Sequence, residues 1–85
     1  MITSFALENK LRTAFSPTIL KVIDDSSAHA GHAGARPEGG SHFKIILRTP
    51  AFEGLSKIQQ HQAIYALLKI EMAGDIHALA LDTGV

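Results

Sequence analysis

The segment His42–Arg48 reads HFKIILR and alternates between two kinds of side chain. Phe43, Ile45 and Leu47 fall on one side of an extended chain, and the residues between them fall on the other. We therefore expect a strand whose Phe43 side lies in the core. The next residues, Thr49–Gly54, have the composition of a turn.

Downstream of this turn, the sequence predicts a helix and then a last strand. Ser56 is a good N-cap for a helix that extends to about Ala73, where Gly74 ends it. The last strand is expected over Ile76–Asp82. On the helix we expect one stripe to face the core, Ile58, His61, Ile64, Tyr65, Leu68 and Met72, and we expect Gln59, Ala63 and Ile70 to lie outside it.

Upstream of the central strand, apolar residues recur at helical spacing over about Ser4–Phe15. Thr3 or Ser4 can cap this helix, and Pro17 stops it. A β-branched segment, Thr18–Asp25, then predicts a strand.

Between the first two strands lies Ser26–Gly40, which is rich in glycine, proline and small residues. A loop of this length is uncommon in a compact domain and is usually functional or disordered. The order of elements is helix, strand, strand, helix, strand. We expect a single α+β domain over residues 1–85, a three-stranded sheet with its helices packed on one face.

Composition narrows the classes of function. The 85 residues carry a formal net charge of zero, so no global field steers the protein toward phosphates or anionic lipid. The absence of cysteine rules out disulfides and favours a reducing compartment. No apolar run approaches a membrane span, and Glu8 and Asn9 interrupt the region where a signal peptide would be apolar. We expect a cytoplasmic protein, or one of the mitochondrial matrix if a transit peptide has been removed.

Histidine is the residue type most suggestive of chemistry. Four of the five histidines, His29, His32, His42 and His77, fall in the long loop or at the start of a predicted strand. Neutral imidazole binds iron, zinc and copper, and it can replace thiolate on one iron of a [2Fe–2S] cluster. Each histidine also has an interpretation without metal binding. His29 and His32 could be solvated loop residues, and His77 could lie at the edge of the core with its ring hydrogen-bonded to a backbone carbonyl.

Six motifs occur in order along the chain: Asp24-Asp25-Ser26, His29 or His32, Ser41-His42-Phe43, Phe52-Glu53-Gly54-Leu55, Gln60-His61-Gln62 and His77-Ala78-Leu79. In this order they resemble the BolA family. One departure is that glutamines flank His61 where the family has arginines. The resemblance implies a class II KH-like fold and association with a monothiol glutaredoxin around a shared [2Fe–2S] cluster.

The resemblance also implies ligands. His77 matches the ligand on the family's last strand, and His29 matches the loop ligand better than His32, which stays a possible substitute. His42 and His61 are expected to be structural. A [2Fe–2S] cluster needs four ligands, ordinarily thiolates, so this chain cannot hold a conventional cluster alone. Two histidines, a glutaredoxin cysteine and a glutathione thiol would make four. We expect the apo protein to be a monomer or a weak dimer.

Nucleic-acid binding by a transcriptional regulator is the alternative. KH-like folds bind single strands, and the helix after the turn offers Lys57, Gln60, Gln62 and Lys69 as a candidate surface. This face has few basic residues for phosphate contacts, and the chain lacks the Gly-x-x-Gly loop between two helices, so we expect weak binding at most. An enzyme has little support, because no nucleophile and base occur together in a recognisable pattern.

Overall fold

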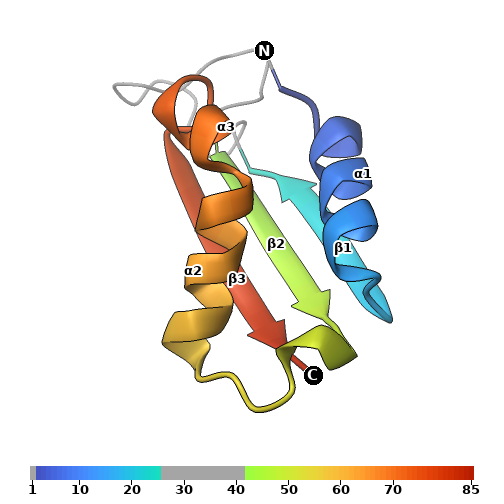
Figure 1. Ribbon diagram of the computed structural model, residues 1–85. Coiled ribbons are helices and arrows are strands. Elements are labelled where there is room, and N and C mark those ends of the chain that lie inside the picture. Colours follow the sequence, from blue (N-terminus) through green and yellow to red (C-terminus); the bar gives the residue numbers. More distant parts are fainter. Residues whose placement is uncertain (1, 26–41) are drawn as a thin grey trace.

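The computed structural model describes residues 2–25 and 42–85 (Figure 1). His29 and His32 lie outside the described residues. The elements follow in the order α1 (Ser4–Phe15), β1 (Ile19–Asp24), β2 (His42–Arg48), the short 3-10 helix η2 (Pro50–Phe52), α2 (Lys57–Leu67), α3 (Lys69–Ala73) and β3 (Ala78–Gly84).

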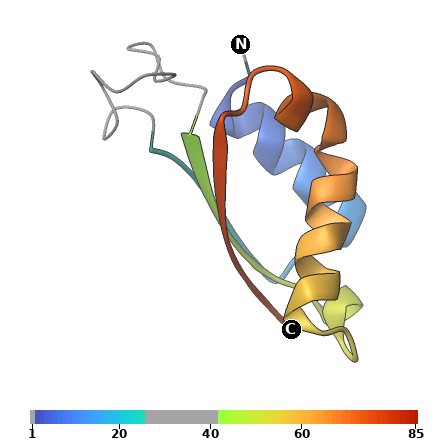
Figure 2. The same ribbon diagram turned by 90° about the vertical axis from the view of Figure 1, so that its left-hand side faces the viewer.

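The three strands form one sheet in the order β1-β2-β3. β1 pairs with β2 antiparallel, and β3 pairs with β2 parallel. The helices of the described residues all cover the same face of the sheet (Figure 2). The predicted α+β class and the one-sided packing of helices are thus confirmed.

The core lies between that sheet face and the helices. Phe43, Ile45 and Leu47 of β2 are fully or almost fully buried, as the alternation of β2 predicts. They pack against Leu7, Leu11, Phe52, Ile64, Leu68 and Ile76.

Local hydrogen bonds explain where the helices begin. The Thr3 hydroxyl accepts from the Ala6 amide at 3.1 Å at the start of α1, which confirms one of the two predicted caps. Ser56 and Gln59 form a reciprocal capping box at the start of α2. Within the described part of the chain, no helix is both long and apolar enough to cross a membrane.

Two element boundaries differ from the prediction. The single helix expected up to Ala73 is broken at Leu68, whose backbone (φ −99°, ψ 19°) separates α2 from α3. The last strand is Ala78–Gly84 rather than Ile76–Asp82. His77 therefore lies just before the strand, where it is exposed and does not share the core face with Leu79.

The predicted core stripe of α2 was also partly wrong. Ile58 is 70% exposed and Tyr65 is 41% exposed, whereas Gln60 is buried and Ala63 packs against the core. The side-chain NH2 of buried Gln60 donates to the Leu55 carbonyl at 2.9 Å, whereas its side-chain oxygen is buried without a hydrogen-bond partner among the described residues. Apolar residues occur all around this helix, so their spacing does not single out one face.

Candidate functional site

Two histidines meet at one end of the sheet. His42 is the first residue of β2, and His77 directly precedes β3. Because β2 and β3 run parallel, with His42 opposite Ala78, their first residues lie at the same end. The two imidazole rings are stacked, with centroids 6.2 Å apart and planes inclined by 28°.

A small pocket lies beside His42. Its lining is Asp25, His42, Phe43, Ala78, Leu79 and Ala80. The Asp25 amide donates to the His42 carbonyl at 2.8 Å, so the end of β1 is tied to the start of β2. Ala78 and Ala80 of β3 contribute only methyl side chains to this lining. This end of the sheet can therefore admit a group that approaches the histidine pair.

The separation of the two rings can be compared with that of two imidazoles bound to one metal ion. An imidazole nitrogen binds zinc at about 2.0–2.1 Å, which puts the ring centroid about 3 Å from the metal. Two imidazoles on one ion thus have centroids at most about 6 Å apart. On a tetrahedral iron the two centroids would be only about 5 Å apart, so at 6.2 Å the rings of His42 and His77 are close neighbours but are not positioned as they stand to bind one iron together.

The pair does not make a complete metal site. Residues 2–25 and 42–85 contain no group of three histidine or carboxylate side chains arranged to hold a metal ion. Two imidazoles would supply two of the four ligands that a [2Fe–2S] cluster needs from outside the cluster, and two would remain to be supplied. Further ligands would come from residues 26–41, which carry His29 and His32 and lie outside the described residues, from a partner, or from a small thiol.

His42 was predicted to be structural, and the structure adds that its ring is stacked on that of His77. Its ring faces His77 rather than the core. Sequence reasoning missed this pair because it depends on the parallel pairing of β2 with β3, which brings together residues 35 positions apart. His61, in contrast, is half-buried on α2, as expected for a structural residue.

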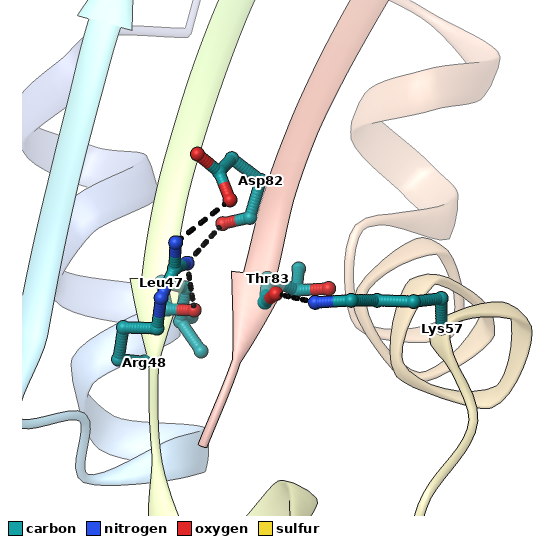
Figure 3. Close-up of polar contacts among 5 residues, drawn as sticks. All are labelled: Leu47, Arg48, Lys57, Asp82 and Thr83. Carbon is teal, nitrogen blue, oxygen red and sulfur yellow. Dashed lines mark hydrogen bonds and ion pairs between the residues drawn. The ribbon is translucent and has the colours of Figure 1, made fainter.

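The predicted nucleic-acid surface is only partly present. Gln60 was expected on it, but only 5% of Gln60 is exposed, because its amide bonds to the Leu55 carbonyl within the fold. The Lys57 ammonium donates to the Thr83 carbonyl of β3 (Figure 3). Gln62 and Lys69 are exposed. The four side chains do not form one continuous exposed surface.

These features describe an α+β domain with a histidine pair at one end of its sheet, and comparisons with known proteins identify its family. The family model described as "BolA-like protein" matches residues 11–84. The chain is 42% identical over 77 residues to the "DNA-binding transcriptional regulator BolA" of Escherichia coli, covering 91% of this chain and 70% of the relative.

Two further likenesses agree. The chain is 40% identical over 76 residues to "BolA-like protein 1" of Pongo abelii, covering 89% of this chain but about half, 53%, of the relative. The solved structure titled "BolA domain of SufE1 from Arabidopsis thaliana" superposes with a TM-score of 0.84 at 33% identity, covering 95% of this chain and 88% of that one. The chain belongs to the BolA family. The names of these relatives denote a regulator and BolA-like proteins, not enzymes.

Proposed function

We propose that this BolA-family protein is an adaptor that works with a monothiol glutaredoxin to bind, stabilise or pass on a shared [2Fe–2S] cluster. The observation that carries the proposal is the stacked pair of His42 and His77 beside an open pocket. The occurrence of a BolA domain within SufE1 also hints at iron–sulfur metabolism.

In this proposal the cluster is cargo, and two histidines of this chain are half of its ligands. A glutaredoxin cysteine and a glutathione thiol complete the four. Neutral imidazole in place of anionic thiolate makes the centre less negative and raises its reduction potential. His77 is one ligand, and the second is His42 or one of the loop histidines, His29 or His32.

The proposal is tested by mixing the protein with a cluster-loaded monothiol glutaredoxin and recording visible absorbance and circular dichroism. We expect the wild-type protein to change the spectrum. His77→Ala should stay folded, because an exposed residue outside the strand tolerates truncation, but should lose the histidine-dependent part of that change.

His61→Ala is the matched control, since it removes a histidine from α2 on the helical side of the sheet. It should behave like the wild type. If His77→Ala gives the wild-type spectrum, His77 is not a ligand. If the wild-type protein itself leaves the glutaredoxin spectrum unchanged, the adaptor proposal fails.

Nucleic-acid binding remains the second candidate because a relative that is 42% identical is named a DNA-binding transcriptional regulator. On this chain the side chains available for it are Gln62 and Lys69, because Lys57 donates to the Thr83 carbonyl and Gln60 is buried. Retention on single-stranded or duplex nucleic acid at moderate salt would support this candidate.

A further inference from the structure

Among residues 2–25 and 42–85, all helices lie on one face of the sheet, and none lies on the other (Figure 2). On this surface, which we call the open face, β1 presents exposed Ile19 and Ile23, at 50% and 41%. The strand registers place the other open-face residues beside them: Lys21, His42, Lys44, Ile46, Arg48, Ala78, Ala80, Asp82 and Gly84.

The open face is positively charged although the whole chain is neutral. Its lysines and arginine number three, and its carboxylates are Asp82 and Asp25, which follows β1 opposite His42, so the net charge is one positive. Arg48 is already engaged, with its guanidinium donating to the Asp82 carboxylate at 2.8 Å and to the Asp82 carbonyl at 2.9 Å (Figure 3). In the described structure, neither Lys21 nor Lys44 has an ion-pair or hydrogen-bond partner for its ammonium.

The open face continues directly from the histidine pair. His42 lies opposite Ala78, and the next outward-facing row across the sheet is Ile23, Lys44 and Ala80. A protein that brings a cluster to His42 and His77 and extends down the sheet therefore meets an exposed isoleucine flanked by lysines. Charge complementarity and apolar contact both favour a partner surface that is apolar with acidic groups around it.

We propose that the open face is the docking surface for the cluster-sharing glutaredoxin, which presents carboxylates to Lys21 and Lys44 and apolar side chains to Ile23. This inference rests on the proposed function. It adds the surface of this chain that selects the partner and the chemistry that the partner has to present.

Two other occupants are less favoured. A second copy of the chain in a two-fold arrangement would set this net positive face against itself. Nucleic acid would find two unengaged lysines for its phosphates, no Phe, Tyr or Trp on the open face for base stacking, and no use for the exposed isoleucines.

The test measures affinity for apo glutaredoxin by titration calorimetry, so that docking is observed without the cluster. Lys44→Glu and the double variant Lys21→Glu/Lys44→Glu change the open face, and Arg12→Glu changes the charge by the same amount on an exposed site of α1. Lys21 and Lys44 are diagonal neighbours on adjacent strands, so the single variant can form a cross-strand ion pair and should fold well. Thermal unfolding checks each variant.

We expect Lys44→Glu to weaken docking about tenfold and the double variant to weaken it further, with a smaller dependence on salt, whereas Arg12→Glu should bind like the wild type. Wild-type affinity of the folded double variant, or no binding of apo glutaredoxin by the wild type, overturns the inference. The inference is also overturned if the double variant loses affinity for a single-stranded oligonucleotide but keeps its affinity for glutaredoxin. The spectral response to loaded glutaredoxin is recorded separately, so failure of docking on this face is distinguished from failure of the adaptor function.

Discussion

At the scale of single residues, one ion pair joins two helices that are far apart in the sequence. The Lys10 ammonium on α1 lies 2.8 Å from a carboxylate oxygen of Glu71 on α3, whose side chain is only 14% exposed. Burial raises the pKa of Glu71, but the hydrogen bond and the charge of Lys10, together with a backbone hydrogen bond, outweigh it and hold the pKa below the ordinary value of 4.5.

This pair should make stability depend on pH. Since the pKa of Glu71 is lower in the folded state, its contribution is fully present above about pH 4.5 and is lost as the pH falls through the folded-state pKa. Lys10→Met, which keeps most of the apolar stem, should lower the free energy of unfolding by about 1 kcal/mol at pH 7 and by less at pH 3.

Urea denaturation at both pH values measures this difference. Glu8→Gln is the control, because it breaks the exposed Glu8–Arg12 pair on the same helix. That pair should contribute less than about 0.5 kcal/mol. An equal loss for Lys10→Met at pH 7 and pH 3 would contradict a role for the Glu71 charge.

The second cluster ligand is also decided by single residues. His42 is held near His77 by β2, whereas His29 and His32 lie in the glycine-rich segment of the sequence, where His29 comes four residues after Asp25. We predict that His29→Ala perturbs the shared cluster more than His32→Ala, because a shorter tether to the strand favours preorganisation.

The double variant His29→Ala/His32→Ala should be worse than either single variant if the two loop histidines substitute for each other. Visible circular dichroism of the complex with glutaredoxin measures this. A double variant with wild-type cluster stability would remove the loop from the mechanism and leave His42 with His77 as the pair, which His42→Ala then tests directly.

At the scale of elements, α2 shows which side of a helix does the packing. Ile64 is fully buried and Ile58 is 70% exposed on the same helix. Ile64→Ala should therefore lower the free energy of unfolding by about 2–5 kcal/mol, a large part of the stability of a small domain. Ile58→Ala should change it by about 0.5 kcal/mol or less.

Because both variants make the same chemical change, the comparison of their urea midpoints reports packing alone. Equal losses would mean that Ile58 faces the core, as the sequence pattern suggested. A gain in solubility on Ile58→Ala without a loss of stability would agree with an outward-facing isoleucine.

The same contrast shows how far the sequence predicts these elements. The alternation of β2 was decisive because a central strand covered on one face has to separate buried from exposed residues strictly. α2 gave no such signal, since it carries isoleucines on more than one side and buries Gln60 through a local hydrogen bond. Of the candidate site, His77 could be proposed from its motif, but its closeness to His42 required the strand order.

At the scale of the whole molecule, a formal charge of zero conceals an uneven distribution. The helical side contains paired charges, Lys10 with Glu71 and Arg12 with Glu8, while Lys21 and Lys44 on the open face have no such partners among the described residues. The net charge of zero argues against long-range steering to nucleic acid. It cannot show a local surface that attracts an acidic protein.

The distribution of charged side chains also limits how strongly the affinity for DNA can depend on salt. Phosphate contacts release counterions, and the logarithm of the affinity falls with the logarithm of salt concentration by about 0.9 for each contact. With Lys57 held by the Thr83 carbonyl and Gln60 buried, Lys69 is the main exposed cation of the predicted surface.

We predict weak duplex binding with a salt slope no steeper than about −2, measured by fluorescence anisotropy between low and physiological salt. Lys69→Gln should make the slope shallower by about one, and Gln62→Ala should leave it unchanged. A slope several units steeper would indicate many phosphate contacts, and a loss of sequence preference in Gln62→Ala would indicate a base contact through this helix. Either result would favour the regulator over the adaptor.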